Sequence, residues 1–246
     1  MNISVICVYN NEEQLNTQLK ASLINQDIKY EFVAIKNTDG RFQSAAAALN
    51  YGARKSTGEV LVFSHQDIFL KTEDGLRELS DAISRCEKGT IIGTQGVREP
   101  SKRYYENLTA GPKFISELSN QYPMDLYPVS CVDEGMFGMK RSTWEEHPFD
   151  ELLCDNWHLY AVEACLWARK NGHPVFVCPV ELHHFSRGKI SLGYMQNLKR
   201  LCQVYRKDFR YIWTTCYKVR TNAFYINTLV ALWRLNRLRK KLFKKG

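Results

Sequence analysis

Short apolar runs that end in polar clusters organise the first 70 residues of the chain. The run at 3–8 (ISVICV) is rich in β-branched residues and is followed at once by the polar turn YNNE. Similar runs follow at 30–36 and 59–64, and a segment with helical periodicity separates each run from the next. Such runs are typical of strands that are buried on both faces of a parallel sheet. The pattern therefore predicts an α/β fold with a doubly wound, mostly parallel sheet flanked by helices.

The remaining elements follow from the same two periodicities. Helices are predicted up to about residue 23 and over 44–55, 74–86 and 156–171, and further strands over 90–97, 129–132 and 174–180. Proline and glycine interrupt the pattern between 98 and 128, so we expect a long, partly mobile loop there. Long helical stretches at about 191–206 and 221–243 end the chain. We therefore predict a catalytic domain at 1–188 and a helical basic extension at 189–246.

Charge divides the chain at the same place. From Arg187 onward lie 16 of the 34 Lys and Arg but only one of the 26 Asp and Glu, so this segment carries +15 and residues 1–186 carry −7. An acidic body argues against a surface built to bind nucleic acid, and we expect no nucleic-acid partner. A basic extension suits an anionic membrane surface.

The last helical stretch is amphipathic. One arc of it carries Leu232, Leu235, Leu238 and Leu242, and the opposite arc carries Arg234, Arg237, Lys240, Lys241 and Lys244. Its longest apolar run, 223–233, is well short of the ~20 residues that span a bilayer. We expect the helix to lie on a membrane. The alternative is a lid that packs on the body and leaves its charges in water.

Cysteine usage and the start of the chain indicate the compartment. The eight cysteines are scattered singly and form no CxxC pair, which predicts reduced thiols. The chain opens directly into a predicted strand, so we expect no signal peptide. Together with the basic extension, this predicts a cytoplasmic protein that is peripheral on the inner face of a membrane.

Two clusters of metal-binding residue types follow predicted strands. His65 and Asp67 (SHQD) end the run at 59–64, and alternation along a strand points both side chains the same way. A carboxylate and an imidazole can hold one edge of a divalent cation whose other ligands are phosphate oxygens. Alternatively, Asp67 caps a turn beside a hydrogen-bonded histidine.

The second cluster is His183 and His184, which follow the strand at 174–180. The carboxyl ends of parallel strands converge at one edge of a sheet, so either histidine could supply a further ligand to the same cation. An isolated histidine pair more often has a structural role. A second cluster at the same edge of the predicted sheet favours the metal site.

Five segments, in order, carry a resemblance to a known family. They are SVICVYNNEEQL, ALNYGARKSTGEVLVFSHQD, VDEGMFGMKRSTWEEHPFDE, WHLYAVEACLWARKNGHPVFV and HHFSRG. Over residues 3 to about 188 the chain resembles the family 2 glycosyltransferases of GT-A fold, and within them a bacterial branch whose metal motif reads HQD. The resemblance implies a hexosyltransferase-like enzyme that uses Mn²⁺ or Mg²⁺ and a nucleoside diphosphate sugar donor. It implies inverting transfer in bacterial surface polysaccharide synthesis. We expect a saccharide or lipid-linked saccharide acceptor, because the basic extension would hold the active site near substrates that stay in the membrane.

The resemblance also implies roles for residues that follow the first strands. Those expected to hold the nucleotide-sugar are Tyr9, Asn10, Glu12, Asp39, Asn50 and Gly52. His65 stands where relatives commonly carry the first aspartate of a DxD motif, and Asp133 and Glu134 resemble the segment that lines the acceptor and donor-sugar pocket in relatives. Asp67 would bind the metal, and His184 would complete its coordination, with His183 as the close rival.

Direct displacement also needs a base that takes the proton of the acceptor hydroxyl. Relatives usually carry an Asp at the start of the late helix, where this chain has Tyr160 and Ala161. The nearest candidates are His158, Glu163 and Asp155, of which the first two rank equally. Asp155 could instead cap the helix, and Glu163 could form half of an exposed ion pair. If no base is present, the chain would be a non-catalytic nucleotide-sugar-binding protein.

Overall fold

The computed structural model of the chain describes residues 2–98, 107–108, 126–185 and 190–242. The expected long loop at 98–128 therefore falls mostly outside the described residues. So do the side chains of the tail residues Leu238, Lys240, Lys241, Leu242 and Lys244.

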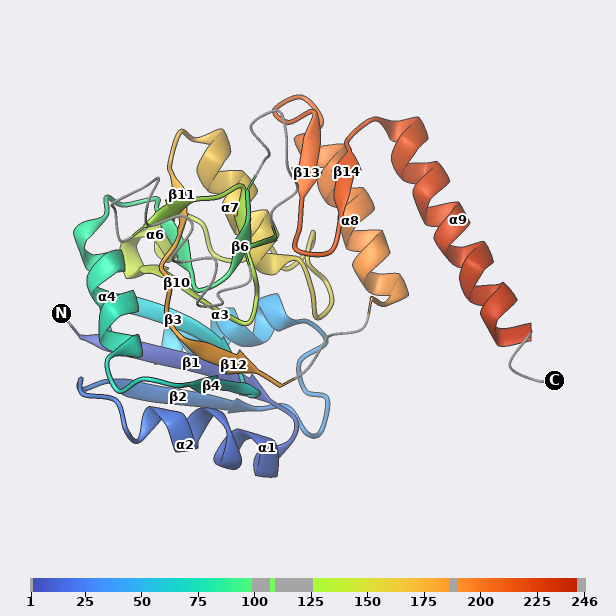
Figure 1. The fold of residues 1–246 in the computed structure, drawn as a ribbon. Helices are drawn as coiled ribbons and strands as arrows, with labels where there is room; N and C mark the ends of the chain where they lie inside the picture. Colours follow the sequence, from blue (N-terminus) through green and yellow to red (C-terminus); the bar gives the residue numbers. More distant parts are fainter. Residues whose placement is uncertain (1, 99–106, 109–125, 186–189, 243–246) are drawn as a thin grey trace.

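The central sheet has seven strands in the order β2-β1-β3-β10-β5-β11-β8 (Figure 1). Its first half is parallel and consists of β1 (Ile3–Tyr9), β2 (Glu31–Lys36) and β3 (Val60–His65). The second half consists of β10 (Met136–Lys140), β5 (Ile91–Gly93), β11 (Val175–Val177) and β8 (Tyr127–Pro128). Of these, β10 runs antiparallel to both β3 and β5, whereas β11 is parallel to β5. The predicted mostly parallel α/β fold is confirmed, although β10 was not predicted.

Helices cover both faces of the sheet. On one face lie α1 (Glu12–Thr17), α2 (Leu19–Leu23) and α4 (Gly75–Arg85), which share a core with Val5 and Cys7 of β1. On the other lie α3 (Ala45–Lys55) and α7 (Tyr160–Lys170), which share a core with Ile6. Successive β1 side chains thus enter opposite cores, as the continuous apolar run predicts.

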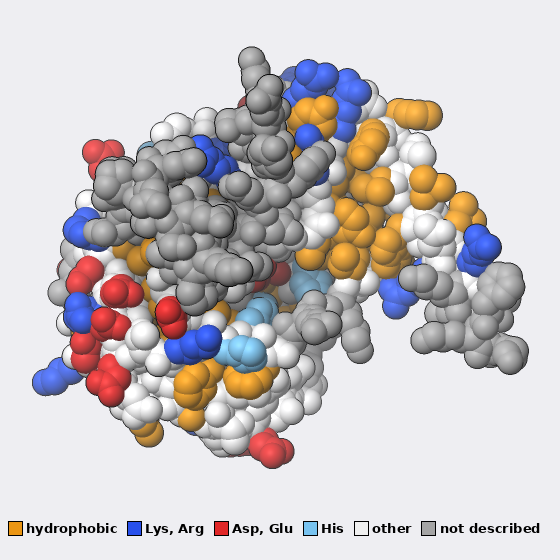
Figure 2. Space-filling model, viewed as in Figure 1, with side chains coloured by type: hydrophobic (Ala, Val, Ile, Leu, Met, Phe, Trp, Pro, Cys, Tyr) orange, Lys and Arg blue, Asp and Glu red, His pale blue; other side chains and the backbone are white. Residues whose placement is uncertain are grey.

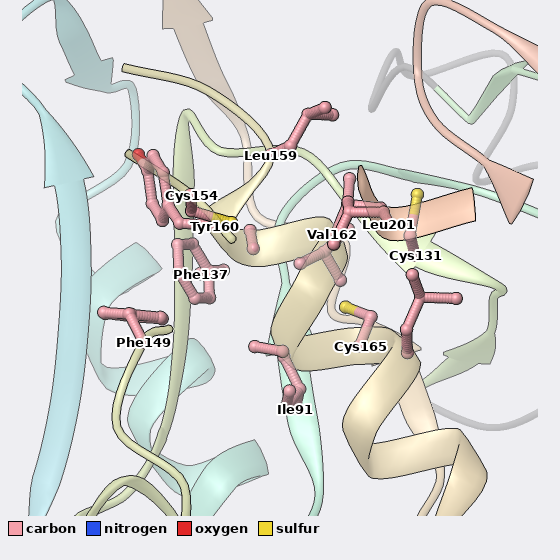
Figure 3. Packing of buried hydrophobic residues seen from close by; sticks show 14 of the residues in the cluster. Ile91, Cys131, Phe137, Phe149, Cys154, Leu159, Tyr160, Val162, Cys165 and Leu201 are labelled. Atoms are coloured by element: carbon pink, nitrogen blue, oxygen red, sulfur yellow. The ribbon is translucent and has the colours of Figure 1, made fainter. Parts of the chain in front are cut away.

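The helix predicted over 156–171 begins four residues later, at Tyr160. Leu159, directly before it, has a left-handed backbone with φ 73°, so the chain turns sharply into the helix. Tyr160 then packs against Phe137 of β10 and Phe149, with ring centroids 6.0 and 5.6 Å away (Figure 3). This aromatic cluster fixes the start of α7 against the centre of the sheet.

Two small sheets lie beside the main one. In the first, β4 (Ile68–Leu70) pairs antiparallel with β12 (Leu182–His184), and the register sets His184 opposite Ile68. The second consists of β6 (Gly96–Val97), β7 (Asn107–Leu108) and β9 (Cys131–Val132). The strand predicted over 90–97 is therefore two strands, β5 and β6, that belong to different sheets. A short helix, α6 (Arg141–Glu146), follows β10.

The C-terminal part contains α8 (Leu192–Tyr205), a hairpin of β13 (Tyr211–Trp213) and β14 (Lys218–Arg220), and α9 (Ala223–Leu242). The inner face of α8 belongs to the same hydrophobic core as α7. Helix α9 packs on this part through Ile226 and Val230, while Leu232 and Leu235 face solvent. Each helix that the structure describes is too short or too polar to cross a membrane. The division of the chain at residue 188 stays a prediction.

Candidate functional site

Three metal-binding side chains from two segments meet at the carboxyl end of β3. His65 ends β3, Asp67 lies in the turn before β4, and His184 ends β12. One ligand atom of each lies within 4.8 Å of the others. The shortest separations are 3.4 Å, from Nε2 of His184 to Oδ1 of Asp67, and 3.9 Å, from Nδ1 of His65 to the same oxygen. The β4–β12 pairing creates this cluster, because it carries His184 to the turn that holds Asp67.

The three residues fit a divalent cation. Adjacent ligands of one ion, each bound at roughly 2.1 Å, lie about 3 Å apart, so the observed separations need only small side-chain rotations to close. Imidazole nitrogen with carboxylate oxygen is a donor set that suits Mn²⁺ and similar ions. Three protein ligands would leave further coordination positions for oxygens of a bound molecule.

The two histidines of the cluster differ in their electrostatic surroundings. Burial lowers the pKa of His65, and the negative charges of Glu134 and Asp67 offset this only in part. Burial acts in the same direction on His184, but the hydrogen bond and the charge of Asp67 outweigh it and raise the pKa of His184. A metal ion at this site would need the neutral form of His184, because only neutral imidazole coordinates.

His183 does not join the cluster. Side chains alternate along β12, so the exposed His183 ring points away and packs edge-on against Phe185, with the centroids 4.4 Å apart. Of the two rival histidines, the structure brings only His184 to Asp67.

The loop after β1 is held beside the cluster by Gln66. Its Oε1 accepts hydrogen bonds from the backbone N–H groups of Asn10 and Asn11, at 3.0 and 3.1 Å. Its Nε2 donates to Oδ1 of Asn10 at 2.9 Å. Gln66, the third residue of SHQD, thus connects the end of β3 to the β1 loop.

A cavity of about 260 Å³ opens between this loop and the cluster. Its lining residues are Val8, Tyr9, Asn10, Asn37, His65, Gln66, Asp67 and Trp157. Tyr9 and Asn10, which the resemblance expects beside a nucleoside, both line this cavity. Asn37 and Trp157 were not predicted; Asn37 directly follows β2, so a polar residue at a strand's carboxyl end was the available signal.

Four other residues expected at the nucleotide do not line this cavity. Glu12 starts α1 and is exposed, and Asp39 lies in the exposed turn after β2, where it accepts a hydrogen bond from the Arg41 N–H at 3.2 Å. Asn50 and Gly52 lie inside α3 and are both buried.

Asn50 and Gly52 instead have structural contacts. The Asn50 amide donates to the Phe149 carbonyl and to Glu151, and its oxygen accepts from Trp144 and from the Phe149 N–H. These bonds use the full hydrogen-bonding capacity of the Asn50 amide, and they hold the segment after α6 against α3. At Gly52 a Cβ atom would lie 2.6 Å from the side chain of Ile6, so the glycine permits close packing of α3 on β1.

A second cavity, of about 420 Å³, adjoins the cluster on its other side. His65 lines both cavities and His184 lines the second, so the two meet at the metal-binding cluster. The second cavity is also lined by Asp133, Glu134, His158, Tyr194 and the hairpin residues Thr214, Thr215 and Cys216. Figure 2 shows histidine and acidic side chains together near the middle of this face.

Hydrogen bonds hold the acidic pair in this second cavity. Asp133 accepts from Thr215 Oγ1 and from the Gly135 N–H, both at 2.9 Å. Oε2 of Glu134 lies 3.5 Å from Nδ1 of His158, whereas its Oε1 is buried without a hydrogen-bond partner in the described structure.

Tyr160 links this pair to the metal-binding cluster. Its hydroxyl lies 3.2 Å from Nε2 of His65 and 3.5 Å from the carbonyl oxygen of Glu134. Burial, together with the negative charges of Glu134 and Asp133, raises the pKa of Tyr160 well above its usual value. The hydroxyl therefore stays protonated and can hold the ring of His65 in place.

The three candidate bases lie in different surroundings. His158 precedes the bend at Leu159 and lines the second cavity. Glu163 is only 1% exposed and faces away, with its carboxylate bound by the Tyr205 hydroxyl at 2.7 Å and near Nε2 of His147 at 3.0 Å. Asp155 is exposed and pairs with Arg200 at 2.6 Å. Ala161 is fully buried in the core.

Residues 4–205 match the model of a family described as "Glycosyltransferase like family". Comparison with curated protein sequences finds no match.

Several solved structures share the fold. GalNAc-T7 with UDP, GalNAc and Mn²⁺ superposes with a TM-score of 0.62 at 15% identity, over 82% of this chain and 47% of that one. TarS from S. aureus with UDP-GlcNAc gives 0.52 at 14% identity, over 85% and 67%. The mannosyltransferase PcManGT from Pyrobaculum calidifontis with GDP-Man and Mn²⁺ gives 0.52 at 16%, over 83% and 63%. The chain thus spans about half the length of GalNAc-T7.

Proposed function

The chain belongs to the glycosyltransferase-like family whose model it matches over residues 4–205, and we propose that it transfers a sugar from a nucleoside diphosphate sugar in a metal-dependent reaction. The observation that carries this proposal is the cluster of His65, Asp67 and His184 where two cavities meet. The solved neighbours that hold UDP, UDP-GlcNAc or GDP-Man, two of them with Mn²⁺, support it.

In this proposal the donor spans both cavities, and the acceptor binds in one of them. The smaller one, between the β1 loop and Trp157, takes the nucleoside, and the larger one takes the sugar and the acceptor. His65, Asp67 and His184 would hold Mn²⁺ or Mg²⁺ between them. A cation there neutralises the charge that develops on the departing diphosphate. Gln66 holds the β1 loop, which lines the nucleoside cavity, next to the end of β3 through its hydrogen bonds to Asn10 and Asn11.

His158 is the base that we propose for the acceptor hydroxyl. Of the three candidates it is the one that lines the larger cavity. The carboxylate of Glu134 beside Nδ1 favours the tautomer that carries the proton there, so Nε2 is left to accept a proton. Glu134 is then a positioning residue. This pair takes the place of the acidic residue that relatives carry where Ala161 stands.

We also propose an acceptor and a cellular setting. A saccharide or lipid-linked saccharide acceptor, inverting transfer and a role in bacterial surface polysaccharide synthesis follow from the sequence resemblance. The basic extension motivates a peripheral position at the cytoplasmic face of a membrane, because it would hold the enzyme near an acceptor that stays in the membrane.

A second function is favoured by the buried alanine at 161. A chain without a base would bind a nucleotide-sugar and not transfer it. His158 and Glu134 argue against this reading, because they offer proton transfer from another position.

A panel of nucleoside diphosphate sugars, each with and without Mn²⁺, tests both functions. We expect one donor to raise the melting temperature only when Mn²⁺ is present, by mass action on the folded state. The same donor should then be hydrolysed slowly or transferred to an acceptor. Stabilisation without any turnover would favour the binding protein, and no stabilisation by any donor with Mn²⁺ would overturn the proposal.

A further inference from the structure

A basic concavity lies at the far end of the β13–β14 hairpin, apart from the two cavities of the candidate site. Its lining residues are Arg206, Lys207, Arg210, Arg220, Thr221, Asn222 and Ala223, and it encloses about 610 Å³. We propose that this concavity binds the phosphate group of an anionic membrane lipid.

The concavity gathers cations from separate segments. Arg206 follows α8, Arg210 precedes β13, and Arg220 ends β14. Each of these side chains, like Lys207, is exposed, and none forms an ion pair with an acidic residue of the described chain. The charges are therefore available to an anion from solution.

The acid in the same turn does not neutralise them. Asp208 is bound by Lys170 of α7, with Nζ 3.2 Å from Oδ2. Among the residues that the structure describes, no acidic side chain lines the concavity. Four positive side chains line it. Their field favours an oxyanion such as phosphate, which can accept several hydrogen bonds.

The backbone beneath these side chains is fixed. Thr221 is buried, and its hydroxyl donates to the carbonyl oxygens of Phe209 and Arg210, at 2.6 and 3.2 Å. Its N–H donates to the same Arg210 carbonyl at 3.1 Å. These bonds hold the two open ends of the hairpin together, so Arg210 and Arg220 start from neighbouring positions.

Exposed apolar side chains next to the concavity point to a lipid as the source of the phosphate. Phe224 and Tyr225, directly after the lining residues, are 81% and 45% exposed. Leu232 and Leu235 continue the exposed apolar surface along α9. Figure 2 shows Lys and Arg side chains above the hairpin and hydrophobic side chains running from there along α8 and α9. An apolar surface does not strengthen the binding of a soluble phosphate. A site at a membrane interface uses both the basic side chains and the exposed apolar side chains.

The hairpin connects this concavity to the candidate site. Its turn lines the larger cavity and binds Asp133 through Thr215, while its open end lines the concavity. At about 3.3 Å per strand residue, the two ends lie roughly 15 Å apart. If the proposed function holds, a lipid phosphate bound here sets the height of the active site above the membrane.

The test measures binding of the full chain to phosphatidylcholine vesicles with and without phosphatidylglycerol, at constant ionic strength and without donor or metal. We expect binding only with the anionic lipid. The double variant Arg210→Gln/Arg220→Gln should weaken it by about tenfold or more. The control Arg54→Gln/Lys55→Gln, at the exposed end of α3, removes the same charge and should bind like the wild type. Phe224→Ser should also weaken binding.

Three results would overturn the proposal. The first is unchanged vesicle binding in the Arg210/Arg220 variant, and the second is an equal loss in the α3 control. The third is saturable binding of inorganic phosphate, lost in the Arg210/Arg220 variant, without any vesicle binding, which would assign a soluble anion. A cooperative thermal melt of each variant serves as the folding control. Because vesicle binding is measured without donor or metal, a failure here is distinguishable from a failure of the proposed function.

Discussion

Nε2 of His184 lies 3.4 Å from Oδ1 of Asp67, although β12 and the turn after β3 are far apart in the sequence. The Phe185 N–H also donates to the Asp67 carbonyl oxygen at 3.1 Å, so backbone and side chain join the same two segments. The candidate metal site is thus part of the pairing between β4 and β12. Its geometry is set by the fold before any ion binds.

Replacement of Asp67 by Asn should remove function and leave the fold. The variant keeps the shape of the side chain but loses the charge that a cation requires. We expect a cooperative melt, loss of Mn²⁺-dependent stabilisation by the donor, and a fall in transfer of about 100-fold or more. His183→Ala is the matched control, because His183 is exposed on the same strand as His184 and should leave all three properties unchanged. A variant that still transfers sugar at the wild-type rate would rule out the metal site.

His158→Ala should lower the turnover number by about 10²–10⁴-fold, the usual contribution of a general base. Donor and Mn²⁺ should still stabilise this variant, because His158 is outside the metal-binding cluster. Added imidazole should restore part of the activity in His158→Ala and none in Asp67→Asn. Glu134→Gln should lower the turnover number by a smaller factor, because it removes the charged partner of His158 Nδ1 and leaves the base itself in place. If His158→Ala keeps the wild-type turnover number, proton transfer by His158 is excluded.

Glu163→Gln should affect stability and not chemistry. The Glu163 carboxylate is buried between His147 and Tyr205, and removal of one member of such a group costs about 2–4 kcal/mol. Urea unfolding measures this loss, and the folded fraction should keep its specific activity. The control is Asp155→Asn, whose exposed pair with Arg200 contributes at most about 1 kcal/mol. Full stability with lost transfer in Glu163→Gln would restore Glu163 as the base.

The stability of the sheet should depend on pH through Glu31. Burial acts to raise the pKa of Glu31, but hydrogen bonds from Ser4 and Thr57 outweigh it, and the pKa is lowered from 4.5. A lowered folded-state pKa contributes stability that is present above the unfolded value and is lost as the pH falls through the folded value. Wild type should therefore exceed Glu31→Gln by about 1–2 kcal/mol in unfolding free energy at pH 7.

The same comparison at about pH 3 provides the check on Glu31, because the difference between the two proteins should shrink there. Glu59→Gln, an exposed change directly before β3, is the control for the loss of one surface carboxylate. An equal difference at both pH values would contradict the assignment.

Much of the fold could be predicted because its strands are buried on both faces. Runs such as 3–8 and 59–64 carry this signal locally, and the polar residues that follow them mark the ligand-binding edge. The strand β10 escaped prediction because its five residues, MFGMK, include a glycine and lack β-branched residues. It is a strand because Gly138 lets it pack against Leu61 of β3, where a Cβ atom would lie 2.5 Å from the Leu61 carbonyl oxygen.

The candidate site was predictable in part. Asp67 and a histidine of the 183/184 pair could be named from their positions after strands, but the choice of His184 depends on the register of β12 against β4. Register is a property of two segments together, so one segment's sequence cannot specify it. The position of His158 before the helix likewise depends on the left-handed bend at Leu159, which no local pattern indicated.

By itself, the sequence determined the class of fold, the edge of the sheet that carries the candidate site, and the division between an acidic body and a basic C-terminal part. These properties follow from periodicity and charge, which are local. Only the tertiary structure decided which histidine meets Asp67, which acid faces a cavity, and that Asn50 and Glu163 are held in structural hydrogen bonds. The physical reason is that a periodic pattern shows which face of an element is buried, whereas the partner that fills that face comes from elsewhere in the chain.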